Sequence, residues 1–139
     1  MNKKIAYQGV QGAYSEQACK NAYGSYETIA CDTFHEAMWM VERGDADLAM
    51  IPLENSTAGR VEEIYRLIPK MSLHVIAEHF EPIVHCLLTL PGVKIEALKY
   101  VASHPQALAQ CHNHILSLGL KAEAKLDTAG AAKELVDLH

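Results

Sequence analysis

Hydrophobic residues along this 139-residue chain fall into short runs that alternate between two periodicities. Short β-leaning runs predict strands at 3–8, 26–30, 48–51, 73–78, 83–90, 100–103 and 121–126, of which the last has the weakest pattern. Between these runs, apolar residues at helical spacing predict two amphipathic helices. Their buried faces are expected to consist of Phe34, Ala37, Met38 and Val41 in one helix, and Val61, Ile64, Tyr65 and Ile68 in the other.

A third helix is predicted over residues 105–118, with Ser103 as its cap and Gly119 directly after its end. Its buried stripe is expected to consist of Leu108, Cys111, Ile115 and Leu118. A T-x-x-E capping box at residues 33–36 begins an earlier helix, and a fourth helix starts near Thr128. The alternation of strands and helices predicts an α/β fold.

The chain is long enough, and with 50% hydrophobic residues apolar enough, for one compact domain or two small lobes. The polar, proline-containing stretch "EHFEPIVH" (78–85) separates two apolar runs and marks the expected lobe boundary. We therefore expect lobe one over residues 1–79 and lobe two over residues 80–139. The last predicted helix has no glycine cap and no closing strand, so lobe two is expected to be incomplete.

Charge and composition exclude several classes of partner. The formal net charge is -5, with 12 Lys and Arg and no basic run, which argues against nucleic acid and against an acidic membrane surface. No stretch has the apolar length of a membrane span or of a signal peptide, so a cytoplasmic protein is expected. The 4 cysteines lack CxxC spacing and are expected to be reduced, mostly buried side chains.

Small polar residues and glycines cluster at four junctions where a predicted strand leads into a predicted helix. These junctions occupy residues 7–18, 51–63, 101–110 and 126–135. Each offers free backbone N–H groups and the positive end of a helix dipole, which bind carboxylates or phosphates without a cation. Because the same residue types also cap helices for stability alone, the junctions by themselves leave both interpretations open.

Two further motifs are only weak indications of a nucleotide cofactor and of a metal site. The first junction supplies only Gly9 and Gly12, without G-x-G-x-x-G or a Walker lysine, so a nucleotide cofactor is not expected. In "CHNH" (111–114), Cys111 belongs to the apolar stripe while the two histidines point elsewhere on a helix. A solvated helix face is favoured over a metal site there, and no metal is expected.

Four stretches, taken in order, carry a resemblance. They are "GVQGAYSEQA", "CDTFHEAMWMVERGDADLAMIPLENSTAGRV", "SHPQALAQC" and "DTAGAA". Together they resemble the catalytic domain of prephenate dehydratases. The resemblance implies a two-lobed fold like that of type 2 periplasmic binding proteins, with prephenate bound between the lobes. It also implies a cytoplasmic homodimer or higher homo-oligomer that needs no metal or organic cofactor.

The family's Thr-Arg-Phe motif and its phenylalanine-binding ACT domain do not occur in this sequence. The resemblance therefore implies a fragment of a longer carbon–oxygen lyase, which converts prephenate into phenylpyruvate, carbon dioxide and water on the route to phenylalanine. The use of arogenate stays open. A different class of function, a two-lobed module that binds a small carboxylate without converting it, and a purely structural fragment also stay open.

The resemblance locates the expected site residues by motif. The catalytic candidates, which match substrate-contacting positions of the family, are Asn55, Ser56 and Gln110. The substrate-binding candidates are Tyr14, Ser15, Ser103, His104, Gln106, Thr128, Ala129 and Gly130, the last two through their backbone. Since Gln106 and Gln110 are four residues apart, both are expected on one helix face.

Overall fold

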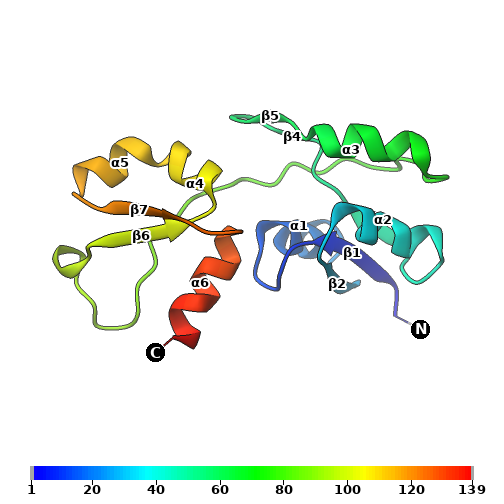
Figure 1. The fold of residues 1–139 in the computed structure, drawn as a ribbon. Helices are drawn as coiled ribbons and strands as arrows, with labels where there is room; N and C mark the ends of the chain where they lie inside the picture. Colours follow the sequence, from blue (N-terminus) through cyan, green and yellow to red (C-terminus); the bar gives the residue numbers. More distant parts are fainter. Residues whose placement is uncertain (1, 139) are drawn as a thin grey trace. The chain divides into compact units, whose positions relative to one another are not determined.

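The computed structural model describes residues 2–138, and the chain divides between Pro82 and Ile83 into two units (Figure 1). Both units combine helices with parallel strands, so the α/β class expected from the sequence is confirmed. The boundary expected between residues 79 and 80 lies in the same polar segment as the observed division. Among the described residues, no helix has the length and apolar character needed to span a bilayer.

The first unit is built on a three-stranded parallel sheet. Its strands are β1 (Lys4–Gln8), β2 (Glu27–Cys31) and β3 (Leu48–Met50), in the order β2-β1-β3. The helix α1 (Tyr14–Ala22) connects β1 to β2, and α2 (Phe34–Glu42) connects β2 to β3. All three strands therefore end at one edge of the sheet, where each chain segment turns into the next element.

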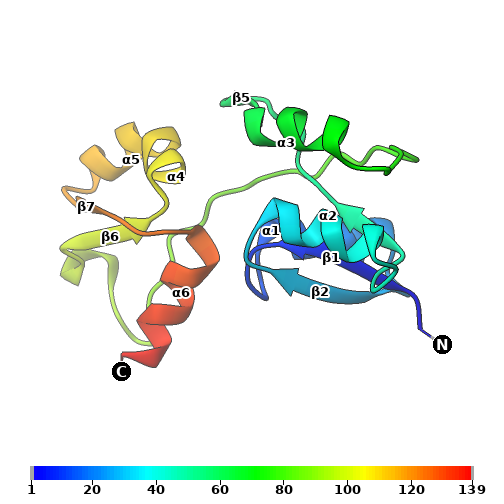
Figure 2. The same cartoon turned by 45° about the vertical axis from the view of Figure 1, so that its right-hand side comes forward.

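The central strand β1 is buried on both faces. Ile5 and Tyr7 pack with Cys19 of α1, whereas Ala6, which points to the opposite face, packs with Ala37 of α2. The sheet is thus covered by one helix on each side, and the strands with both helices are seen in Figure 2. This double cover explains why β1 is a continuous apolar run and not an alternating one.

The remainder of the first unit follows β3. A short hairpin is formed by β4 (Glu54–Asn55) and β5 (Gly59–Arg60), and the helices α3 (Glu62–Leu67) and η1 (Ile68–Lys70) come next. Ile64 anchors α3 because it is completely buried.

The Thr33 cap predicted at residues 33–36 is confirmed, whereas the return bond of Glu36 is made to Asp32, one residue before the N-cap. Thr33 Oγ1 accepts a hydrogen bond from the Glu36 backbone amide at 3.0 Å, and the Glu36 carboxylate accepts one from the Asp32 backbone amide at 3.0 Å.

The second unit is built on two parallel strands. Its elements are η2 (Ile95–Ala97), β6 (Tyr100–Ser103), α4 (Pro105–Gln110), α5 (His112–Ser117), β7 (Lys121–Ala124) and α6 (Thr128–Asp137). The strand β6 pairs with β7 so that Ser103 lies opposite Ala124. Gly119 follows α5 with a φ of 66°, the left-handed conformation expected for a glycine after a helix.

The predicted helix over residues 105–118 is wrong in two respects. Cys111 has φ -99° and ψ 8°, which departs from helical rotation and separates α4 from α5. The apolar stripe is therefore not continuous: Ile115 is buried, but Leu118 is 36% exposed. The cap is also His104 and not Ser103, because His104 Nδ1 accepts the Gln106 backbone amide at 3.1 Å.

The strands predicted at 73–78 and 83–90 are not present among the described residues, where neither segment joins a β-ladder. Their apolar side chains are instead exposed, Val75 by 72% and Leu88 by 61%. An apolar run predicts a strand, but the strand forms only where a neighbour offers its backbone groups.

Candidate functional site

In the second unit, the fold brings two of the four predicted junctions to one edge of the β6–β7 sheet. The strands are parallel, and directly after them the Lys125 backbone amide donates to the Ser103 carbonyl at 2.8 Å. The start of α4 and the start of α6 therefore follow neighbouring strand ends. This edge gathers six of the seven candidates that the sequence placed in 101–110 and 126–135, and the seventh, Gln110, is the last residue of α4.

In the first unit, the other two junctions follow neighbouring parallel strands. Tyr14 and Ser15 begin α1 after β1, and both are half-buried. Asn55 and Ser56 lie beyond β3, in the β4–β5 hairpin, where Ser56 is exposed. Both junctions therefore follow the carboxyl ends of adjacent strands, the usual position of ligand sites in α/β sheets.

The side chain of Asn55 is oriented by its own turn. Its Oδ1 accepts hydrogen bonds from the backbone amides of Thr57 at 2.9 Å and Ala58 at 3.1 Å. This is an Asx turn, which uses the oxygen of the carboxamide and not its nitrogen. Because Nδ2 makes no hydrogen bond within residues 2–138, Asn55 is available to a ligand only as an N–H donor.

The side-chain oxygen of Gln110, like that of Asn55, is engaged within the protein, but by a different residue. His85 Nε2 lies 2.6 Å from Gln110 Oε1. An amide oxygen only accepts, so the histidine nitrogen donates and the oxygen is engaged. Gln110 thus also presents its NH₂ group, and both carboxamides singled out from the sequence are donors.

The Ser103 hydroxyl makes no hydrogen bond to any of the described residues. Its Oγ is buried, with no partner in the part of the chain that the structure describes. Leaving a buried hydroxyl unpaired costs about 1–3 kcal/mol, and such exceptions call for an explanation. The neighbouring His104 is engaged through Nδ1 in the α4 cap, whereas no bond from the Gln106 side chain is present among residues 2–138.

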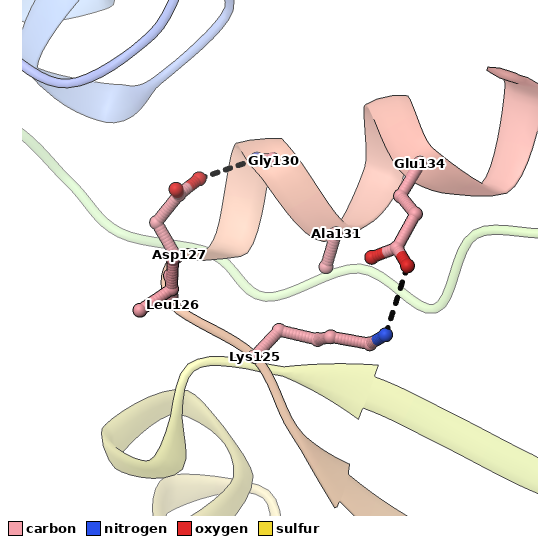
Figure 3. Close-up of a pocket in the computed structure, with 6 residues that line it drawn as sticks. All are labelled: Lys125, Leu126, Asp127, Gly130, Ala131 and Glu134. Atoms are coloured by element: carbon pink, nitrogen blue, oxygen red, sulfur yellow. Dashed lines mark hydrogen bonds and ion pairs between the residues drawn. The ribbon is translucent and has the colours of Figure 1, made fainter.

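The first turn of α6 is already partly occupied by the chain itself. Asp127 caps this helix by accepting the Gly130 backbone amide (Figure 3). An external carboxylate at this turn would therefore meet the amides of Thr128 and Ala129, with the Asp127 charge beside them.

A shallow cavity of about 250 Å³ adjoins this turn, and Figure 3 shows its lining. Lys125 Nζ is paired with Glu134 at 3.0 Å across it. The Lys125 charge is thus neutralised internally, and of the predicted site residues only Gly130 lines the cavity.

The first junction is anchored by a buried carboxylate, Glu16, whose structural role the sequence did not reveal. It accepts the Gly12 backbone amide at 2.7 Å and the Thr28 hydroxyl at 3.1 Å, and it pairs with Lys20 at 2.9 Å. The Gly12 amide, followed by Lys20, lowers the pKa of Glu16 below its usual value, despite desolvation by burial. Glu16 therefore fixes the loop before Tyr14 and Ser15.

A second cavity, of about 160 Å³, lies in the first unit at the edge where the strands end. Its lining consists of Gln8, Asp32, Thr33, Phe34 and Glu63, none of which the sequence predicts as a site residue. Two carboxylates make this cavity unsuited to a dianion.

The cysteines and other ligating side chains show no metal-site arrangement. Within residues 2–138, no group of three or more His, Cys, Asp or Glu side chains could hold a metal ion. All four cysteines are free, but only Cys19 and Cys31 are buried, so the expectation that most are buried is not met by the exposed Cys86. Burial raises the pKa of Cys19 to about 11, which keeps that thiol protonated.

Comparison with known proteins decides the family. The sequence matches the prephenate dehydratase family over residues 5–138. The chain belongs to the prephenate dehydratase family. Its α/β fold is accordingly the periplasmic-binding-protein-like fold of this family's catalytic domain.

The prephenate dehydratase relatives are longer than this chain. Arogenate dehydratase 2 of Petunia hybrida is 52% identical over 94% of the chain and 33% of the relative. A bifunctional N-acyl-homoserine lactone acylase/prephenate dehydratase of Komagataeibacter europaeus is 43% identical over 93% of the chain and 46% of the relative. The chain therefore spans a third to a half of the length of these relatives.

Two solved structures are similar to this member of the prephenate dehydratase family. GqqA, a quorum-quenching acylase, superimposes with a TM-score of 0.89 at 41% identity, over 98% of this chain and 50% of that one. Prephenate dehydratase of Arthrobacter aurescens, solved with L-Phe, has a TM-score of 0.88 at 30% identity, over 96% of this chain and 46% of that one.

Proposed function

We propose that this chain binds prephenate and supplies part of the active site that converts it into phenylpyruvate, carbon dioxide and water. One observation carries the proposal: Asn55 and Gln110, the carboxamides in two family motifs, both have their oxygen engaged within the protein and their NH₂ group available. Prephenate offers two carboxylates, a ketone and a hydroxyl, which are all acceptors for such donors.

Neutral donors suit the chemistry of this reaction. The ring carboxylate leaves as carbon dioxide, so its electron pair moves into the ring while the ring hydroxyl departs with a proton as water. A full cation beside that carboxylate would stabilise the charge where it starts and oppose its movement. Amide N–H groups bind the dianion and can stabilise the departing oxygen, without holding the charge so strongly.

The remaining candidates complete the donor set of this proposal. The Ser103 hydroxyl, buried and without a partner among the described residues, gains one if a substrate oxygen reaches it. Tyr14 and Ser15 at the start of α1, and Thr128 with the Ala129 amide at the start of α6, are proposed to bind carboxylate oxygens. Ser56, His104, Gln106 and the Gly130 backbone stay proposed contacts from the motif alone.

The test replaces only the presented atoms. In N55D and Q110E the oxygen that serves the Asx turn or His85 is kept, while the outward NH₂ becomes an oxygen. We expect phenylpyruvate formation to fall by about 100-fold or more, since a lost transition-state donor costs that much. Asn113→Asp, which adds the same charge on the exposed face of α5, is the control.

The complete open reading frame that encodes this chain is the protein to assay, with the chain itself alongside. Turnover close to wild type in both N55D and Q110E, with the fold intact by circular dichroism, would contradict the proposal. Binding of prephenate without turnover would instead identify a non-catalytic binding module. Arogenate and an N-acyl-homoserine lactone serve as comparison substrates, because relatives are named for these activities.

We further propose a homodimer or higher homo-oligomer in the cytoplasm, as the family resemblance implied. Light scattering after size-exclusion chromatography tests the first part, and a monomer would contradict it. Cell fractionation tests the second, which is informative because the Arabidopsis thaliana relatives are named chloroplastic.

A further inference from the structure

We propose that His85 is a positioning residue for Gln110, which it holds with the carboxamide nitrogen turned outward. The proposal rests on the proposed function, in which Gln110 donates to the substrate. His85 belongs to the extended segment after Pro82, and Gln110 is the last residue of α4. Although 25 residues separate them, His85 Nε2 and Gln110 Oε1 lie 2.6 Å apart.

Gln110 needs such a partner because nothing else among the described residues fixes its amide. The side chain is exposed, and the terminal torsion of a glutamine is broad and roughly two-fold. Without a partner, the carboxamide can therefore present either its oxygen or its nitrogen. An outward oxygen would repel a substrate carboxylate, so the histidine selects the productive orientation.

The contact also specifies the state of the imidazole. Since an amide oxygen cannot donate, His85 must carry a proton on Nε2. Both the Nε2–H neutral tautomer and the imidazolium satisfy this requirement. The segment around His85 thus has a function that its apolar pattern does not explain, namely to place one nitrogen at the end of α4.

The experiment compares three substitutions at two positions in the complete reading frame. His85→Leu removes the donor, and His85→Gln restores one, because the glutamine Nε2 reaches about as far as the imidazole Nε2. His112→Leu, at an exposed histidine of α5, controls for the loss of an imidazole. We expect H85L to lower kcat by about tenfold or more, H85Q to recover most of it, and H112L to leave it unchanged.

The double variant H85L/Q110A separates positioning from a general structural role. If His85 acts through Gln110, the double variant loses no more activity than Q110A alone, so the two effects do not multiply. Multiplicative losses, or H85L with wild-type kcat while Q110A is impaired, would overturn the inference and leave the proposed function standing. Wild-type kcat in Q110A would instead refute the donor role of Gln110 itself.

A spectroscopic measurement keeps the inference testable if H85L does not fold. In long-range ¹H–¹⁵N spectra of the wild-type protein, we expect the His85 signals of a protonated Nε2, and a shift of these signals in Q110A. A bare Nε2 in the folded wild type would overturn the inference.

Discussion

Replacement of Ser103 by alanine is expected to separate stability from activity. The Ser103 hydroxyl is buried at the end of β6 and has no partner among the described residues. A hydroxyl left unpaired in a protein interior costs about 1–3 kcal/mol, and its removal relieves that cost while only a small space is left. S103A is therefore expected to change the free energy of unfolding by between zero and about +2 kcal/mol, so that the variant is at least as stable as the wild type.

The sign of the change in the free energy of unfolding shows whether the Ser103 hydroxyl has a partner in the folded protein. If the hydroxyl had a partner in the folded protein, its removal would lower stability by about 1 kcal/mol, the usual net worth of a hydrogen bond. Urea unfolding followed by circular dichroism measures the change. A loss of about 1 kcal/mol or more in S103A would refute the reasoning.

A matched hydroxyl in the other unit supplies the comparison. Thr33 Oγ1 is satisfied as the cap of α2, so Thr33→Ala is expected to cost about 1 kcal/mol. The single tryptophan, Trp39, lies in α2 and reports this unit by fluorescence. Turnover should show the reverse order: a clear loss in S103A and little change in T33A, because the proposed site contains Ser103 and not Thr33.

Three further predictions concern stability and reactivity. The Gly12 amide lowers the folded-state pKa of Glu16, so the ionised Glu16 stabilises the folded protein. This contribution is fully present above the unfolded-state pKa of about 4.3, and it is lost as the pH falls through the lower folded-state pKa. Glu16→Gln should cost about 1–2 kcal/mol in urea unfolding at pH 7 and flatten this acid dependence, and an unchanged acid limb would contradict it. Gly119→Ala should cost about 1 kcal/mol in the same assay, since φ is 66° with no other atom near an added Cβ, and equal stability would argue against the left-handed turn. In a thiol-labelling time course at pH 8, exposed Cys86 should react rapidly and buried Cys19, with a pKa of about 11, only on unfolding, so rapid labelling of Cys19 in C86S would be unexpected.

The sequence predicts the elements fixed by local chemistry, and it also predicts the strands β1, β2, β3, β6 and β7, which each find a parallel partner. The Thr33 cap and the glycine turn at Gly119 need only neighbours in the chain, and both are present. The strands expected at 73–78 and 83–90 depend on a distant ladder partner, which no local pattern can supply. The break at Cys111 has no glycine or proline to signal it.

The candidate site likewise combines features set by neighbouring residues with features set by distant ones. Motifs located the residues, but they could not show which atom each residue presents. The orientation of Asn55 follows from its own turn and could have been anticipated from an Asn at a hairpin. The orientation of Gln110 depends on His85 in a separate segment, and the orphaned Ser103 hydroxyl depends on how β6 is packed. Serine ranks above histidine as a cap, yet here the histidine caps α4.

The Asx turn at Asn55 also bears on how this protein would age. Asn55 is followed by Ser56, in an exposed turn between two short strands, and asparagine is a thermolabile residue that deamidates. Deamidation to aspartate would keep the oxygen that accepts from Thr57 and Ala58, so the hairpin would persist. The outward nitrogen alone would be lost, replaced by a charged oxygen. A stored sample could therefore become inactive while its fold, as judged by spectroscopy, stayed intact.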